Sequence, residues 1–168
     1  MNLANRQVVD LYRFLTGLEK EVDERGEFVK VNRNKITDKA VRAAVIDNIV
    51  ALAPIDERVK NQESILREQY FTEEYIELYK QFIAANRAKD VAKMDSLNEA
   101  LKEAEKPFAA DYLASREKLF SEEKEVNLTL IDRDAFDAAT EACNFSMKIY
   151  VEFAFMFETN KGGKNEEN

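Results

Sequence analysis

The sequence predicts a mainly α fold of the α+β type, namely an antiparallel helical bundle with a long coiled-coil-like helical hairpin and one small two-stranded sheet. Apolar residues recur three and four positions apart over most of the chain, which is the period of an amphipathic helix. Only four glycines and two prolines occur in 168 residues, so long stretches contain no helix breaker. Two short segments instead favour strands.

Length and composition indicate one folded domain. A chain of 168 residues fits a single core, and its 45% of hydrophobic residues can offset the loss of chain entropy. We expect one helical domain over residues 1–159, with an extended hairpin arm at about residues 55–120. Residues 160–168 contain no apolar side chain, so this tail is expected to be disordered.

The first helix is predicted from Leu3 to Arg25. Gly26 follows its last basic residue, where a left-handed C-cap favours glycine. The next segment, Glu27 to Val31, contains aromatic and β-branched residues and predicts a short strand. The predicted first helix has one apolar face, which is formed by Val8, Leu11, Leu15, Leu18 and Val22.

The second helix is expected to begin after Thr37 or Asp38, because either side chain can accept hydrogen bonds from the first helical turn. Pro54 lacks an amide proton, so the helix should kink or break nearby, and the sequence leaves both alternatives open. Thr72 could cap a third helix. The buried stripe of the second helix is formed by Val41, Val45, Ile49 and Leu52.

The arm is predicted from Arg87 to Lys106, where a narrow apolar stripe is flanked by many charges. Pro107 interrupts it. Beyond the arm, Val126 to Leu130 alternates apolar and polar residues, which predicts a second strand that would pair with Glu27 to Val31. Asp132 or Asp134 could then cap a long final helix that reaches Met156.

Catalytic chemistry is disfavoured by what the chain lacks. Without histidine, it cannot form Ser-His-Asp or Cys-His pairs, HExxH zinc sites or Glu-x-x-His iron sites. Its four glycines form no phosphate-binding loop. Carboxylate runs such as Glu73, Glu74 and Glu77 are typical of a solvated helical face. We therefore expect no enzyme activity, no catalytic residue, no metal site and no cofactor.

Charge and cysteine content predict the partners and the compartment. A net charge of −8 argues against direct binding to nucleic acid, which needs clustered cations. The single cysteine, Cys143, suits a reducing compartment and is expected to be a buried structural thiol. The N-terminus resembles no signal peptide and no apolar run is long enough for a membrane span, so we expect a cytoplasmic protein without a membrane partner.

One locally basic segment is a candidate anion or partner patch. Its cations lie just before a predicted helix N-terminus, where backbone donors and positive charge could together hold an anion. Alternatively, these cations form ion pairs with the acidic residues that the protein has in excess. The patch consists of Lys30, Arg33, Asn34, Lys35, Lys39 and Arg42.

The aromatic end of the last helix is a candidate apolar interface, since exposed apolar patches mark oligomer or partner surfaces. Tyr75 and Tyr79 also lie four residues apart, a spacing that is more typical of a helix seam than of a ligand cage. The candidate interface consists of Phe153, Phe155, Met156 and Phe157.

The order of segments is a leading NRQVVDLYRFLTGL helix, then FVKVNRN, a long charged hairpin, EVNLTLI and a closing amphipathic helix. It resembles small uncharacterised helical proteins encoded by tailed bacteriophages, in which an N-terminal helix precedes a strand, an Arg-Asn pair and a long helix. Arg33 and Asn34 correspond to that pair. The resemblance spans most of the chain. It implies a bacterial host cytoplasm during infection and a non-catalytic role.

The leading hypothesis is a non-enzymatic protein-binding module, encoded by a phage, that acts on a host or defence protein as an inhibitor or adaptor. A phage assembly or structural helper that forms a homo-oligomer is the first alternative. The second is an acidic mimic of nucleic acid, although lysine and arginine are spread through the same helices. The third is an anion or small-ligand binder at Lys30 to Arg42.

Overall fold

The computed structural model describes residues 1–18, 20–22, 28–32, 35–143 and 148–158. The chain forms two compact units. The terminal unit comprises Met1–Asp56 and Glu123–Asn168, and the middle unit comprises Glu57–Glu122. The mainly α fold class, a helical bundle with small two-stranded antiparallel pairing, is confirmed. The middle unit covers nearly the same residues as the segment at about 55–120 in which the sequence predicts a hairpin arm.

The terminal unit begins with strand β1 (Asn2–Ala4) and helix α1 (Asn5–Gly17). Strand β1 pairs antiparallel with β4 (Glu123–Glu125), and Leu3 lies opposite Lys124. The pairing continues by one residue, because the Met1 ammonium group donates to the Val126 carbonyl oxygen at 2.9 Å and Val126 N donates back to Met1 O at 2.8 Å. Residues near the N-terminus are therefore tied to a segment more than a hundred positions away.

The first helix is shorter than predicted, because α1 ends at Gly17 and the chain continues into β2 (Lys20–Val22). Strand β2 pairs antiparallel with β3 (Phe28–Val31). The extension of the helix to Arg25 was wrong, since spacings of four residues fit both a helix and an alternating strand. The predicted glycine cap at Gly26 lies outside the described residues.

Helix α2 (Lys39–Tyr70) is one continuous helix, with Pro54 in its interior. Its first part belongs to the terminal unit and its second part to the middle unit. Of the two caps that the sequence allows, Thr37 and Asp38, the structure uses Asp38. Its carboxylate accepts hydrogen bonds from Ala40 N and Val41 N. Pro54 therefore does not end the helix.

The predicted pairing of Glu27–Val31 with Val126–Leu130 was wrong. Residues 126–130 form no regular strand, and β3 pairs with β2 instead. A hairpin between neighbouring segments closes a much shorter loop than a pairing across most of the chain, so it costs less entropy. The segment after β4 is held by side-chain hydrogen bonds instead of a strand ladder.

The predicted long final helix was also wrong. Helix α6 (Arg133–Thr140) begins at its Asp132 cap and passes into the short 3-10 helix η1 (Glu141–Cys143). Further on, α7 (Ile149–Glu152) and η2 (Ala154–Met156) are single turns. The chain then doubles back, because Ile131 N donates to Met156 O at 3.1 Å and Glu158 N donates to Ile131 O at 3.0 Å. This return brings the C-terminal aromatic residues into the core of the terminal unit.

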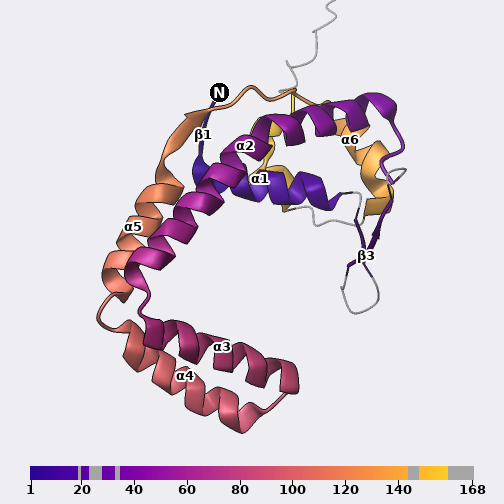
Figure 1. The fold of residues 1–168 in the computed structure, drawn as a ribbon. Coiled ribbons are helices and arrows are strands. Elements are labelled where there is room, and N and C mark those ends of the chain that lie inside the picture. The colour runs from indigo at the N-terminus through magenta and orange to yellow at the C-terminus, as the bar shows by residue number, and fades with distance from the viewer. Residues whose placement is uncertain (19, 23–27, 33–34, 144–147, 159–168) are drawn as a thin grey trace, which may run out of the picture. The chain divides into compact units, whose positions relative to one another are not determined.

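The middle unit contains the second part of α2 and three further helices, α3 (Glu73–Ala88), α4 (Val91–Glu105) and α5 (Ala109–Ser121). Helices α3 and α4 run side by side as an antiparallel hairpin, and α5 lies along the second part of α2 (Figure 1). Lys89 adopts a left-handed conformation with a φ of 57° at the hairpin turn, and Asp90 caps α4. Leu97 and Leu101 form the buried stripe of α4.

Within the described residues, no helix combines the length and the apolar character that a membrane span requires.

Candidate functional site

The predicted basic patch is only partly described by the structure. Arg33 and Asn34 lie outside the described residues, and Lys30 is described only as part of strand β3. Lys35 donates from Nζ to the Lys20 carbonyl oxygen at 2.9 Å, so its ammonium group is hydrogen-bonded to strand β2. Lys39, an exposed residue, begins α2. The described part of the patch is thus spread along the entrance to this helix.

The start of α2 is already occupied by an anionic group of the chain itself. Asp38 Oδ1 accepts from Ala40 N at 2.8 Å and from Val41 N at 2.9 Å. These are two of the backbone donors that a bound anion would use at a helix N-terminus. Arg42 instead lines a hollow of only about 70 Å³ with apolar neighbours from α1 and α2. The geometry therefore gives little support to an anion site here.

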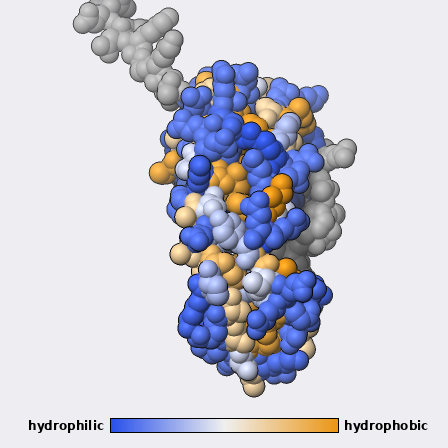
Figure 2. Space-filling view, turned by 60° about the vertical axis from the view of Figure 1, so that its left-hand side comes forward, coloured by the Kyte–Doolittle hydropathy of each residue, from blue (hydrophilic) through white to orange (hydrophobic). Residues whose placement is uncertain are grey.

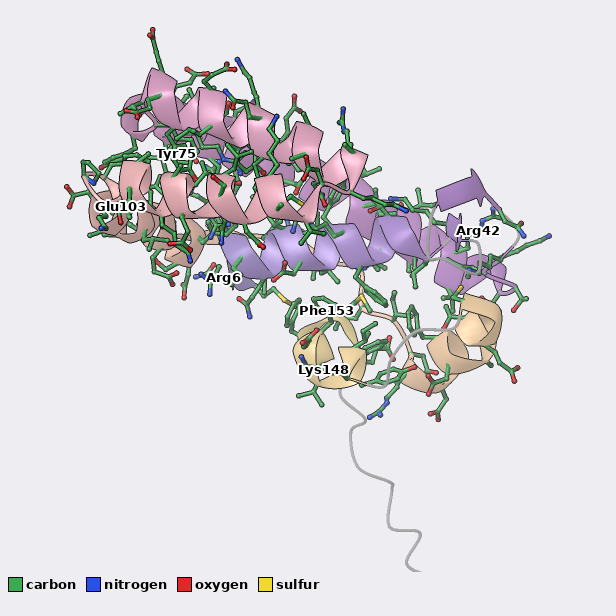
Figure 3. All side chains as sticks on the ribbon, turned by 90° about the horizontal axis from the view of Figure 1, so that it is seen from below. Arg6, Arg42, Tyr75, Glu103, Lys148 and Phe153 are labelled. Carbon is green, nitrogen blue, oxygen red and sulfur yellow. The ribbon has the colours of Figure 1, made fainter. Side chains whose placement is uncertain are left out.

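The predicted apolar interface at the C-terminal end is instead part of the core. Phe153 and Phe157 are 6% exposed, Met156 is fully buried and Phe155 is half-buried. Phe153 stacks on Phe14 of α1, with ring centroids 5.2 Å apart, and Figure 3 shows it on the side of its helical turn that faces the bundle. The prediction failed because the segment folds back onto Ile131 instead of continuing as a surface helix.

The middle unit contains a groove that the sequence did not predict. It has a volume of about 300 Å³, and its walls come from the end of α2, the link to α3, the first half of α3 and the first turn of α5. We call it the aromatic groove. Its lining residues are Arg67, Phe71, Tyr75, Ile76, Tyr79, Lys80 and Tyr112.

The aromatic groove is built on a cluster of rings around Phe71. The ring of Phe71 lies 4.9 Å from that of Tyr75 and 4.9 Å from that of Tyr112, between centroids. Phe108, which is buried, supports the cluster from beneath at 5.4 Å from Phe71 and 5.2 Å from Tyr75. Such tilted and edge-to-face pairs are favourable arrangements of aromatic rings. The cluster holds the walls of the groove in fixed positions.

Outward from this cluster, the groove has an exposed edge. Tyr79 is 50% exposed and Ile76 is 38% exposed, although both are large and partly apolar. Figure 3 shows Tyr75 between helices of the middle unit, and Figure 2 shows apolar side chains exposed between hydrophilic ones on the lobe that holds α3 and α4. Thr72 fixes the start of α3, because Tyr75 N donates to its hydroxyl oxygen at 3.2 Å. The exposed residues therefore project from a capped, well-packed helix.

A network of charged groups borders the groove. Glu63 accepts from Arg116 Nε at 2.7 Å and pairs with Arg67 at 3.3 Å. Partial burial by itself would raise the pKa of Glu63, but the hydrogen bond from Arg116 and the charge of Arg67 outweigh it, so the pKa is lowered. A hydrogen bond to Tyr112, together with the charge of Glu63, raises the pKa of Arg67. Arg67 and Tyr112 both line the groove wall.

The phenol of Tyr75 is stabilised in its protonated form. Burial is the main reason that its pKa is raised, and the nearby negative charge of Glu105 acts in the same direction. A protonated phenol can donate a hydrogen bond to an anionic group. The groove can therefore offer a stacking surface, phenol donors and the cations Arg67 and Lys80 to a bound group.

A second, wider groove lies between the second part of α2 and α5. It has a volume of about 750 Å³, and we call it the long groove. Its apolar floor includes Ile65, which is 51% exposed, and the buried Leu119. The rim is mostly uncharged, with Lys118 and Glu122 as its charged members. Its full lining is Gln62, Ile65, Leu66, Gln69, Ser115, Lys118, Leu119, Ser121 and Glu122.

Sequence reasoning missed the aromatic groove although one signal was present. Four aromatic residues occur within ten positions, namely Tyr70, Phe71, Tyr75 and Tyr79. Their spacing by itself indicates a helix seam. Phe108 and Tyr112 complete the cluster from a segment more than thirty residues away, and a sequence gives no information on that contact.

Among the described residues, no group of three or more carboxylate and cysteine side chains is arranged to hold a metal ion. Comparisons with protein-family models, with curated proteins and with solved structures give no match to this chain.

Proposed function

We propose that the protein is a non-enzymatic protein-binding module and that the aromatic groove of the middle unit is its binding surface. The observation that carries this proposal is the exposure of Tyr79 and Ile76 beside an ordered ring cluster. Tyrosine and arginine are among the residues that contribute most to binding energy at protein interfaces. A tyrosine that is half exposed has apolar surface still available for burial against a partner.

The rigid setting of these side chains supports the same proposal. Tyr79 lies one helical turn beyond Tyr75, whose ring packs on Phe71 and Phe108. Side chains that project from a packed helix lose little conformational freedom on binding, which favours affinity. The lining of the groove also lacks histidine, cysteine and carboxylates, the usual groups for acid–base and nucleophilic catalysis.

The resemblance to phage-encoded proteins extends this proposal to a biological setting. In that setting the partner is a protein of the bacterial host, such as a defence protein, and the module acts as an inhibitor or adaptor in the host cytoplasm. An acidic chain with a net charge of −8 is compatible with a protein partner.

The long groove favours a second candidate function, a phage assembly helper that forms a homo-oligomer. Two antiparallel helices with an apolar floor between them can receive a further helix in the manner of a bundle. The half-exposed Ile65 is the side chain that such packing would cover.

Capture from a bacterial lysate, with the bound proteins identified by mass spectrometry, tests the leading function. The wild type is compared with Tyr79→Ala and with Val91→Ala, a matched control on α4 whose side chain is 66% exposed. We expect one host protein that the wild type and Val91→Ala enrich and that Tyr79→Ala loses. Light scattering on the same samples separates the two functions. A homo-oligomer that Ile65→Ser disrupts, without a captured host protein, would instead support the assembly role.

A further inference from the structure

We infer that one exposed face of α2 binds the same face of a second copy of this chain, with the two helices antiparallel. We call this face the α2 seam. None of its residues lines the aromatic groove or the long groove, so the inference goes beyond the functions proposed above. The α2 seam consists of Lys39, Ala43, Ile46, Val50, Ala53 and Glu57.

Helix α2 is apolar on two opposite faces around the α2 seam. One face packs into the core of the terminal unit through Val41, Val45 and Leu52, which are at most 4% exposed. On the other face, Ile46 is 50% exposed and Val50 is 66% exposed. A surface helix ordinarily carries polar residues on the face that does not meet the core. The exposed apolar side chains therefore indicate a further packing surface.

The α2 seam is a bounded patch and not a general property of the helix. The next residues on the same face of α2 are Asn61, Ser64 and Glu68, which are polar and exposed. An exposed helix face that changes from apolar to polar at Glu57 indicates that only the apolar stretch meets a partner.

The spacing of the α2 seam suits packing against another helix. Its six residues follow one another at intervals of four, three, four, three and four positions. This alternation is that of a coiled-coil seam, in which two helices with the same repeat stay in contact along their length. The seam extends over about 27 Å at the rise of an α-helix. A second copy of α2 has the matching repeat.

The apolar residues of the α2 seam are arranged to match themselves in reverse order. From either end, an alanine is followed by a larger β-branched residue. In an antiparallel pair, Ile46 would lie opposite Val50 of the second copy, and Ala43 opposite Ala53. A two-fold axis repeats each of these contacts, as the interface of a symmetric dimer requires.

The charges at the two ends of the α2 seam identify the second copy as the occupant. Lys39 at one end and Glu57 at the other are exposed, and among the described residues neither has an ion-pair partner in its own chain. An antiparallel pair brings Lys39 of each copy opposite Glu57 of the other, whereas a parallel pair would bring like charges together. The seam is thus complementary to itself in the antiparallel orientation.

The length of the α2 seam limits the strength of the dimer. A contact of about five helical turns is smaller than the standard interface, which buries roughly 800 Å² per partner. We therefore expect a reversible dimer with a dissociation constant on the order of 10 to 100 μM.

Sedimentation equilibrium of the full chain, from about 5 μM to about 1 mM, tests the inference. We expect a monomer–dimer equilibrium for the wild type. Val50→Asp should weaken the dimer by more than about tenfold, because it places a carboxylate against Ile46 of the second copy. Ile65→Asp, at a similarly exposed position of the same helix outside the seam, should leave the dimer unchanged. Circular dichroism spectra that match the wild type show that the variants are folded.

Charge variants test the pairing at the ends. Lys39→Glu and Glu57→Lys should each weaken the dimer by about threefold to tenfold, because each places like charges opposite one another. The double variant restores opposite charges and should recover the wild-type affinity to within about twofold. Asp47→Asn should strengthen the dimer, since the antiparallel pair places the two exposed Asp47 side chains on the same side of the two-fold axis.

Cysteine cross-linking tests the orientation in a Cys143→Ser background. An equal mixture of Ile46→Cys and Val50→Cys should form disulfide-linked dimers faster than either variant alone, because these two positions face each other only in the antiparallel pair. Faster linking of each variant to itself would show a parallel pair and contradict the inferred orientation.

The remaining outcomes also decide the matter. A strict monomer at about 1 mM, or full dimer affinity in Val50→Asp, would overturn the inference. A dimer that Ile65→Asp dissociates and Val50→Asp leaves intact would move the contact to the long groove. A monomer whose capture of a lysate protein is lost in Val50→Asp would replace the second copy with another protein.

Discussion

The side chain of Asn48 forms two hydrogen bonds with the backbone of Thr129, which lies 81 positions away in the chain. Asn48 Oδ1 accepts from Thr129 N at 2.7 Å, and Asn48 Nδ2 donates to Thr129 O at 3.0 Å. The amide thus pairs with the peptide group as a neighbouring strand would. Asn48 is fully buried in α2, so the segment that follows β4 is fixed against this helix without a sheet.

Replacing the buried Asn48 with alanine should lower the free energy of unfolding by about 2 kcal/mol, because both of its hydrogen bonds with the Thr129 backbone are lost. Chemical denaturation followed by circular dichroism measures this change. Asn61→Ala is the matched control, since Asn61 is an exposed asparagine of the same helix and its loss should change stability by less than about 0.5 kcal/mol. Equal effects of the two variants would contradict the role assigned to Asn48.

The Glu63 network should make stability depend on pH in the acidic range. Because the pKa of Glu63 is lowered in the folded protein, its contribution is present above its ordinary value of 4.5 and is lost as the pH falls through the lower folded-state pKa. Glu63→Gln should be less stable than the wild type at pH 7 by about 1 kcal/mol, which is the scale for a partly exposed pair. The difference should shrink on acidification.

Unfolding curves at pH 7 and at about pH 3 check the prediction for Glu63. Glu68→Gln provides the comparison, because Glu68 is an exposed residue of the same helix. A deficit in Glu63→Gln that stays constant over this range would show that packing, and not the charge of Glu63, is responsible.

Met156 provides a test of the buried C-terminal segment. It is 0% exposed, so Met156→Ala should create a cavity and lower the free energy of unfolding by about 2 to 5 kcal/mol. Val151, nearby in the chain, is 81% exposed, and Val151→Ala should cost less than about 0.5 kcal/mol. If Met156→Ala lowered the free energy of unfolding only slightly in thermal and chemical denaturation, the segment would lie at the surface, as the sequence predicts.

Asp38→Ala should destabilise the protein by about 1 kcal/mol, because the amides of Ala40 and Val41 lose the carboxylate that caps them. Asp38→Asn should restore most of this stability, since an asparagine oxygen can also accept these bonds. Addition of phosphate provides a further readout by differential scanning fluorimetry. If phosphate stabilised Asp38→Ala but not the wild type, the vacated donors would be shown to bind an anion.

The caps of the helices were predictable because a cap is a local feature. Asp38, Thr72 and Asp132 each accept a hydrogen bond from an amide two or three residues further on, so the sequence alone contains both partners. The break after α4 at Pro107 is equally local. These signals, together with the helical period of the apolar residues, were sufficient for the mainly α class and for most helix starts.

The candidate sites were much less predictable. The C-terminal aromatic residues were expected at a surface, because the sequence cannot show that Phe157 packs against Phe136 with ring centroids 5.2 Å apart. The aromatic groove was missed for the converse reason. Its ring cluster requires Phe108, which precedes α5, and Tyr112 of α5 beside Phe71, and only the packing of the middle unit brings them together.

The sequence by itself thus determined where most helices begin, the break at Pro107 and which helix faces are apolar, because propensity, capping and periodicity act within a few residues. Only the tertiary structure decided that β1 pairs with β4, that Asn48 holds Thr129 and that Phe153 is core. Those outcomes depend on which distant segments exclude water together. The free energy gained by burying these apolar surfaces depends on the packing of the whole chain and cannot be assigned to any short stretch of it.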